Sequence, residues 1–321
     1  MNADRRKYFS LVWIAILAIS FSAYGQTSTP QGGPTSIFTV YNVEPLRKGE
    51  YTLSAAYPNF DANVQTHQLK SKLMARDIPY RIILPLGYDD KANVIKKYSV
   101  VYLLHGLTGH YVNWTDKTKL VEYAANHEFI IVTPEGDNGW YSDSVSIPND
   151  KYESYIVKEL IPEIDSKYHT FADRDHRFVA GLSMGGYGAL KFGLKYPELF
   201  SLVGSFSGAL GATGFTEKNA GVNIGKGIDA IFGPEDSDSR KSNDIFKIIR
   251  EMTPEKVKGL PYIYQSCGTE DFLIQNNRDY LKLLNDMKVP HEYREHPGIH
   301  DWVFWDDQVR EFLAVADRMK K

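Results

Sequence analysis

The sequence predicts an α/β fold, in which a mostly parallel central sheet is covered by helices on both faces. Apolar runs of strand length recur along the chain, and residues 99–104 form a continuous one, which suits a parallel strand buried on both sides. Stretches with helical spacing separate these runs. The chain has 321 residues, of which 43% are hydrophobic, enough for a sizeable core.

The first 25 residues have the layout of a secretory signal peptide. A positive stretch at residues 5–7 precedes an almost wholly apolar run at residues 9–23, and Ala23 and Gly25 supply small residues for a signal peptidase. A membrane anchor is the alternative, but the run is shorter than the ~20 residues of a spanning helix. We therefore expect cleavage after Gly25 and a secreted or periplasmic protein without stable membrane insertion.

The rest of the chain is expected to be a flexible leader followed by one domain. Residues 26–36 are small and polar and are interrupted by Pro and Gly, which is typical of a flexible segment. Residues 37–321 contain no internal repeat or low-complexity tract and are assigned to a single domain, although residues 37–63 give weak signals. The net charge of −3 argues against nucleic acid as a partner.

The first half of the domain is predicted to contain four strands and two helical segments. The strands are residues 67–75, 78–84, 99–104 and 129–133, and the helical segments are 119–127 and 151–168. The first two strands are expected to pair in an antiparallel manner. Pro162 lies inside the second helical segment, so a kink or a restart of the helix is expected there.

The second half continues the alternation of strands and helices. The strands are residues 177–180, 201–206, 261–266 and 291–295, and the helices are 187–196, 276–287 and 304–319. From residue 208 to residue 244 glycines and charges dominate, so this segment is interpreted as an insertion or a lid rather than core. Cys267 is the only cysteine, which excludes an intramolecular disulfide and predicts a buried thiol.

The stretch at residues 181–186 reads Gly-Leu-Ser-Met-Gly-Gly and joins a predicted strand to a predicted helix. A Gly-x-Ser-x-Gly in that position indicates a nucleophile elbow, in which small residues at Gly181 and Gly185 allow a tight turn. Ser183 is therefore the candidate nucleophile. A pattern of five residues also occurs by chance in glycine-rich turns, so the partners of the serine have to be found.

A serine hydroxyl needs a base, and the base is usually oriented by a carboxylate. Downstream of Ser183 the histidines are His291, His296 and His300. His300 follows the last predicted strand, in the turn before the final helix, and is the favoured base. His296, at the end of that strand, is the leading alternative.

The carboxylate is expected in the loop after the strand at residues 261–266. Glu270 and Asp271 both lie there, and the residues alone do not separate them. Asp301 is adjacent to His300 in sequence and is expected instead to cap the final helix.

Two backbone amides are expected to bind the oxyanion of a tetrahedral intermediate. Met184, directly after the nucleophile, supplies one of them. The other is expected from the loop at residues 105–109, which follows the strand at 99–104, and Leu107 is the chosen donor. His105 opens this loop; its position upstream of the serine favours a structural role over that of the base, and it is also a tentative substrate contact.

Four motifs in this order resemble one family of α/β-hydrolases, which contains esterase D (S-formylglutathione hydrolase), feruloyl and acetyl-xylan esterases and the mycobacterial mycolyltransferases. They are residues 105–109, 181–186, 268–271 and 298–302, and the resemblance covers roughly residues 64–318. It implies the α/β-hydrolase fold, Ser183 as nucleophile, His300 as base, Asp271 rather than Glu270 as the acid, and the amides of Leu107 and Met184 as the oxyanion hole. Residues 139–144 also resemble a family stretch beside the active site, which makes Trp140 and Tyr141 tentative substrate contacts.

The residues and the resemblance together predict an exported serine esterase that removes acetyl or feruloyl-type groups from carbohydrate or small esters. The alternatives are an acyltransferase with a sugar acceptor, a thioesterase similar to S-formylglutathione hydrolase, and a carbohydrate-binding protein without activity. No cofactor is expected, and no metal site, because no further cluster of His, Asp or Glu has metal-ligand spacing. The oligomeric state is not predicted.

Overall fold

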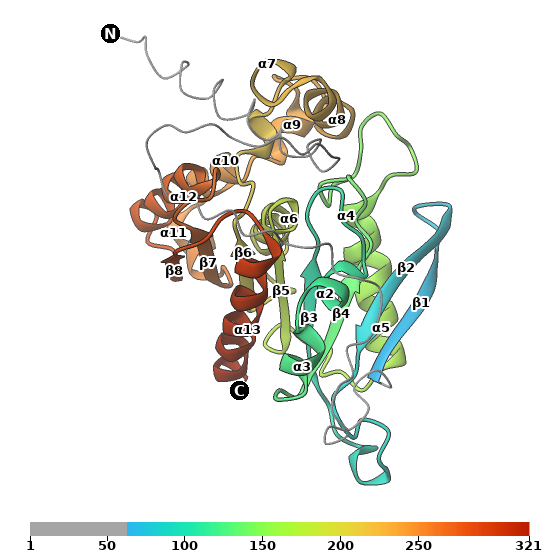
Figure 1. Ribbon diagram of the computed structural model, residues 1–321. Coiled ribbons are helices and arrows are strands. Elements are labelled where there is room, and N and C mark those ends of the chain that lie inside the picture. The colour runs from blue at the N-terminus through green and yellow to red at the C-terminus, as the bar shows by residue number, and fades with distance from the viewer. Residues whose placement is uncertain (1–62, 321) are drawn as a thin grey trace, which may run out of the picture. The chain divides into compact units, whose positions relative to one another are not determined.

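An eight-stranded sheet with the order β1-β2-β4-β3-β5-β6-β7-β8 runs through the computed structural model, which describes residues 63–320 (Figure 1). The strands are β1 (Val64–Ser71), β2 (Arg76–Ile83), β3 (Ser99–Leu104), β4 (Phe129–Pro134), β5 (Arg177–Leu182), β6 (Leu202–Phe206), β7 (Tyr262–Gly268) and β8 (His291–His296). β1 pairs antiparallel with β2, as predicted, and β2 pairs antiparallel with β4. All pairings from β4 through β8 are parallel.

The hydrophobic pattern agrees with which strands lie in the interior of the sheet and which lie at its edges. Every residue of β3, β4, β5 and β6 is buried, which matches their largely apolar sequences and their place in the interior of the sheet. The edge strands β1 and β8 are more polar and only partly buried. The parallel strands bring their carboxyl ends to one edge of the sheet, where loops can converge on a site.

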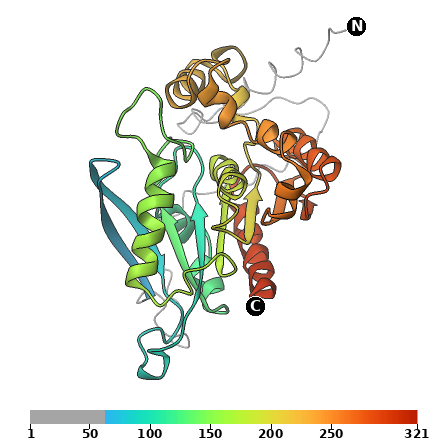
Figure 2. The same cartoon turned by 180° about the vertical axis from the view of Figure 1, so that it is seen from behind.

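Helices cover both faces of the sheet. Figure 1 shows α2 (Asn113–Lys117), α3 (Leu120–Ala124) and α13 (Trp302–Met319) in front of the strands. The view from behind in Figure 2 shows α4 (Tyr152–Tyr155), α5 (Ile161–Lys167) and α6 (Met184–Lys195) on the opposite face. This layered arrangement is the fold that the alternating pattern predicts.

The segment around Pro162 restarts as expected. A π-helical stretch, η3 (Ile156–Leu160), joins α4 to α5, and Pro162 lies in the first turn of α5. A proline is tolerated there because the amides of a first helical turn have no partner within the helix.

Several helices have no counterpart in the sequence-based prediction. They are η2 (Lys91–Asn93), α2, η4 (Ala212–Gly214), α7 (Glu217–Ala220), α8 (Val222–Phe232), α9 (Asp238–Ser242), α10 (Ile245–Arg250) and α11 (Pro254–Lys258). By contrast, α12 (Ile274–Asp286) matches the helix predicted at 276–287. Of the helices without a counterpart, only α8 is longer than six residues, and the others are too short to show a helical period. In α8, Gly225 and Gly227 interrupt the pattern.

The interpretation of residues 208–244 as lacking core is wrong for part of that segment. Ile228, Ile231 and Phe232 of α8 are buried, and the Phe232 ring meets the Tyr187 ring of α6 edge to face. The beginning of the segment also contacts the turn that carries Ser183, because the Ala209 amide donates to the Ser183 carbonyl oxygen over 3.0 Å. In Figure 1, α7, α8 and α9 gather beyond one end of the sheet.

Cys267 is buried on β7 and free, as predicted. The predicted signal peptide (1–25), the leader (26–36) and the start of the predicted domain lie outside the described residues. Within residues 63–320, no helix has the length and hydropathy needed to cross a membrane.

Candidate active site

Ser183 occupies a strained turn between β5 and α6. Its backbone has φ 53° and ψ −115°, a conformation that residues other than glycine rarely adopt. The glycines on either side are required by space: a Cβ at Gly185 would lie 2.4 Å from the Leu104 carbonyl oxygen, and one at Gly181 would lie 2.5 Å from the Gly185 backbone. The close approach of β3, β5 and α6 therefore accounts for the Gly-x-Ser-x-Gly pattern.

Three side chains from distant parts of the chain meet at this turn. The Ser183 Oγ lies 3.0 Å from His300 Nε2, and His300 Nδ1 lies 2.9 Å from Asp271 Oδ2. Asp271 is only 2% exposed, and its other oxygen accepts a 2.8 Å hydrogen bond from the Leu273 amide. The acceptor-only carboxylate thus faces one ring nitrogen and the hydroxyl faces the other, which is the geometry of a Ser-His-Asp relay.

The structure distinguishes the contacts of Glu270 from those of Asp271. The Glu270 side chain accepts a 2.7 Å hydrogen bond from the Gly298 amide, and this bond lowers the pKa of Glu270. Glu270 therefore holds the turn that carries His300, whereas Asp271 contacts the imidazole itself.

Aromatic packing fixes the His300 ring. The ring lies 4.6 Å from the Phe272 ring and 4.9 Å from the Trp305 ring, between centroids. Asp301 follows and caps α13 by accepting from the Phe304 amide, as predicted.

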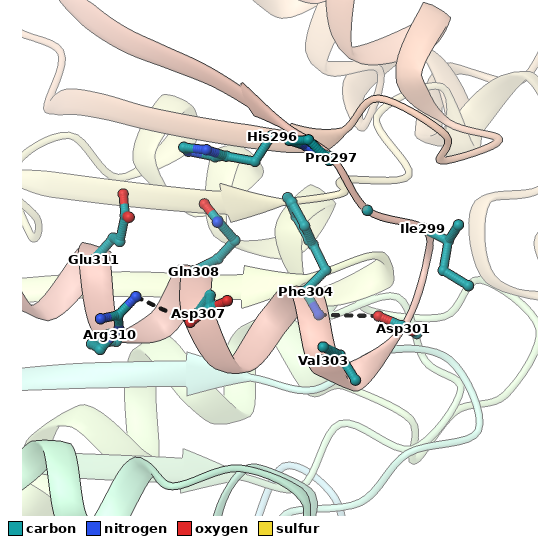
Figure 3. Close-up of a pocket in the computed structure, with 11 residues that line it drawn as sticks. His296, Pro297, Ile299, Asp301, Val303, Phe304, Asp307, Gln308, Arg310 and Glu311 are labelled. Atoms are coloured by element: carbon teal, nitrogen blue, oxygen red, sulfur yellow. Dashed lines mark hydrogen bonds and ion pairs between the residues drawn. The ribbon is translucent and has the colours of Figure 1, made fainter. Parts of the chain in front are cut away.

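His296, the alternative base, has no contact with Ser183. It lines a hollow of about 320 Å³ between the end of β8 and the first turns of α13, shown in Figure 3. The charged groups there are occupied, because Arg310 pairs with Asp307 and Asp301 caps the helix. Ile299 and Asp301 contribute to its wall while His300 does not, so the hollow lies behind the turn that carries His300.

The loop after β3 lies against the nucleophile. A Cβ at Gly106 would come within 3.5 Å of the Ser183 Cβ. In the part of the chain that the structure describes, the amides of Leu107 and Met184 donate to no protein acceptor. Met184 begins α6, so its amide is one of those that a helix leaves without an internal partner.

His105, which was predicted tentatively as a substrate contact, is enclosed by protein in the structure. It is 1% exposed, and both ring nitrogens have protein partners: Nδ1 lies 2.8 Å from the Gly106 carbonyl oxygen, and the Gly136 amide lies 2.9 Å from Nε2. The Glu135 carboxylate also lies 3.1 Å from Nε2. Burial by itself raises the pKa of Glu135, but the hydrogen bond with His105 and two backbone amides lower it overall.

Trp140 and Tyr141 are also buried rather than open to a substrate, at 4% and 0% exposure. The Trp140 ring meets Tyr187 and Phe215 edge to face. The Tyr141 ring fills the space beside Gly136 and Gly188, where a Cβ would clash with it. Both side chains therefore pack against protein in this structure, and their contact with a substrate stays a prediction. An aromatic pair in a loop gives the same sequence signal for packing and for substrate contact.

Sequence reasoning missed a buried ion pair beneath the site. Lys191 of α6 is fully buried, and its Nζ lies 2.8 Å from a Glu153 oxygen on α4 and donates to the Tyr141 carbonyl oxygen over 2.7 Å and to Ser142 Oγ. Burial lowers the pKa of Lys191 to about 8, against the opposing effect of Glu153. One charge inside the apolar run of α6 is the signal that could have found it.

No cluster of three or more His, Cys, Asp or Glu suited to a metal occurs among residues 63–320.

Known proteins are similar to this chain in sequence and in structure. Residues 71–314 match the family described as "Putative esterase". An acetyl esterase of Caldicellulosiruptor saccharolyticus is 31% identical over 251 residues, which cover 74% of this chain and 92% of that protein. An esterase of Mycobacterium tuberculosis is 30% identical over 253 residues, covering 71% of this chain and 53% of its own length.

A solved ferulic acid esterase superposes with a TM-score of 0.68 at 27% identity, covering 80% of this chain and 98% of that one. These matches confirm the resemblance, the α/β-hydrolase fold and the prediction of an enzyme of the serine hydrolase class. The chain belongs to this esterase family of α/β-hydrolases.

Proposed function

We propose that the protein hydrolyses carboxylic esters with Ser183 as nucleophile, His300 as base and Asp271 as the acid that orients the base. The observation that carries this proposal is the unbroken contact from Asp271 Oδ2 through the His300 ring to Ser183 Oγ, over 2.9 and 3.0 Å. Few structural roles require a buried carboxylate, an imidazole and a hydroxyl in that order.

The first half of the reaction forms an acyl-enzyme. His300 Nε2 takes the proton of Ser183 as Oγ attacks the ester carbonyl carbon. The oxyanion that develops is bound by the amides of Leu107 and Met184, which donate to no protein acceptor within residues 63–320. The C–O bond to the alcohol then breaks, and the alcohol leaves with the proton from His300.

The second half releases the acid. Water gives a proton to His300 Nε2 and attacks the acyl carbon, and the proton returns to Ser183 Oγ as the acyl bond breaks. Asp271 accepts from Nδ1 throughout, which holds the ring in one orientation and stabilises its positive form.

For the substrate, we propose acetyl or feruloyl-type esters of carbohydrates or small alcohols. The relatives named acetyl esterase and ferulic acid esterase support this class. Export, which the N-terminal sequence predicts, would bring the enzyme to substrates outside the cytosol. Turnover of matched acetyl, feruloyl and longer acyl esters, free and linked to sugars, measures the preference. A preference for thioesters would contradict this choice.

The nucleophile is tested with Ser183→Ala. We expect p-nitrophenyl acetate turnover to fall by about 10³-fold or more, because the acyl-enzyme can no longer form. A fluorophosphonate probe should label the wild-type protein and not the variant. Ser207→Ala is the matched control, since Ser207 is also buried and directly follows Phe206, whose carbonyl oxygen accepts from the Ser183 amide, but Ser207 has no hydrogen bond to His300. Undiminished turnover by Ser183→Ala would contradict the assignment.

A further inference from the structure

His105 opens the loop that carries the proposed Leu107 donor, but its buried ring cannot contact a substrate. Its hydrogen bonds instead lead to the peptide group that joins Gly106 to Leu107. The Gly106 carbonyl oxygen accepts from the Gly109 amide over 3.0 Å and lies 2.8 Å from His105 Nδ1. Two donors therefore fix the carbonyl end of this peptide group.

The other end of the same peptide group is the Leu107 N–H. A peptide unit is planar and trans, so fixing the direction of its carbonyl fixes the direction of its N–H on the opposite side. In most loops a peptide plane can rotate at small cost. Here rotation would break both bonds to the Gly106 oxygen and leave buried polar groups without partners, which typically costs about 1–3 kcal/mol for each group.

The protonation of the ring supports the same reading. A carbonyl oxygen can only accept, so Nδ1 must carry a proton and donate to Gly106. Nε2 then either accepts from the Gly136 amide in the neutral ring or donates to Glu135 in the charged ring. Both states keep the Nδ1 donor, so the bond to Gly106 does not depend on which is present.

Tyr141 contacts both the backbone and the ring of His105. The Tyr141 hydroxyl donates to the His105 carbonyl oxygen over 2.9 Å, and the two rings meet edge to face at 5.8 Å. The Tyr141 backbone is bound in turn by the buried Lys191 ammonium. These contacts oppose any movement of His105 that would follow a rotating peptide group.

We propose that His105 is a positioning residue that holds the Leu107 N–H in the orientation required to bind the oxyanion. The inference rests on the proposed function, because it needs Leu107 to be an oxyanion donor. It concerns the transition state alone: a misdirected amide weakens binding of the tetrahedral oxyanion, whereas binding of the neutral ester changes little.

A matched pair of variants tests it. The side-chain nitrogen of Asn takes roughly the position of Nδ1, whereas the amide of Gln takes roughly that of Nε2. His105→Asn therefore keeps the donor to Gly106, and His105→Gln loses it. We expect kcat to fall about 10-fold to 100-fold in His105→Gln with KM within about twofold, and to recover largely in His105→Asn.

Two further measurements separate positioning from general damage. Fluorophosphonate titration counts the competent sites, so kcat is corrected for any protein that does not fold. The affinity for a boronic acid, which forms a tetrahedral adduct on the serine, should fall in parallel with kcat in His105→Gln.

Three outcomes decide the matter. Equal kcat in both variants after titration, or a greater loss in His105→Asn, would overturn the role of His105. A loss expressed in KM alone would do the same. Ser183→Ala is measured alongside, because full turnover by that variant would reject the proposed function itself, independently of His105.

Discussion

At the scale of single residues, the site assigns different tasks to two adjacent acids. Glu270 and Asp271 both carry a carboxyl group and are adjacent in the chain. The backbone turn nevertheless directs Glu270 to the Gly298 amide and Asp271 to His300. One acid therefore shapes the turn, and the other faces the ring that moves the proton.

This difference predicts unequal effects of removing each charge. Asp271→Asn should lower kcat by about 10⁴-fold, because an amide nitrogen can force the imidazole into the wrong tautomer. Glu270→Gln should lower it less than about fivefold, since the Gln oxygen can still accept from Gly298. Steady-state kinetics on p-nitrophenyl acetate measures both.

Thermal unfolding of the two variants serves as the control for folding. If Glu270→Gln matched the loss in Asp271→Asn, Glu270 would have to be placed in the relay and the assignment of Asp271 would be wrong.

At the scale of elements, α6 joins the nucleophile to a buried electrostatic cluster. The helix begins directly after Ser183, and two turns later Lys191 reaches Glu153 on α4. Lys195 binds the same carboxylate at 2.5 Å, and the Tyr196 hydroxyl donates to it over 2.7 Å. Glu153 thus fastens the nucleophile helix to α4 and, through Lys191, to the loop that carries Tyr141.

Breaking this cluster should cost stability. Glu153→Gln leaves the Lys191 ammonium buried without its counter-charge, and we expect a loss of about 3–5 kcal/mol in the free energy of unfolding at pH 7, measured with urea. The matched control is Glu163→Gln on α5, whose pair with Lys167 is partly exposed and should contribute less than about 1 kcal/mol. Equal losses in the two variants would contradict the role of Glu153.

The same variant should change the response to acid. Burial by itself raises the pKa of Glu153, but the Lys191 and Lys195 ammonium groups outweigh it and lower the pKa from 4.5 to about 2. Below the unfolded value the unfolded chain binds the proton more readily, so the stability that Glu153 contributes is present above pH 4.5 and is lost as the pH falls towards 2. Glu153→Gln should lack that component of acid unfolding.

At the scale of the whole molecule, the parallel sheet assembles the site. Ser183 follows β5, Asp271 follows β7, His300 follows β8 and Leu107 follows β3. Neighbouring parallel strands end at one edge, so residues more than a hundred positions apart come within hydrogen-bond distance there.

The proposed export also belongs to this scale. Expressed from its full sequence in a bacterial host, the protein should be recovered from the periplasm or the medium with Gln26 as its first residue, as measured by intact mass. Leu17→Arg interrupts the apolar run and should retain the uncleaved chain in the cells. Recovery of uncleaved protein in the soluble cytosolic fraction of the unmodified strain would contradict the signal peptide.

Local sequence was sufficient for much of this protein. Apolar runs, helical spacing and glycine-bearing turns depend on near neighbours, so they predicted the eight strands, the long helices, the buried thiol of Cys267 and the turn that holds Ser183. The order of the motifs along the chain also favoured His300. It follows the last strand, and the loops after parallel strands all lie at the same edge of the sheet as Ser183.

Only the tertiary structure decided which polar group each side chain contacts. It directed Glu270 to Gly298, buried Trp140 and Tyr141 as packing, enclosed His105 and paired Lys191 with Glu153. The physical reason is that burial and hydrogen bonding depend on what other segments bring to the same place. Those segments are tens to hundreds of residues away, and no local pattern encodes them.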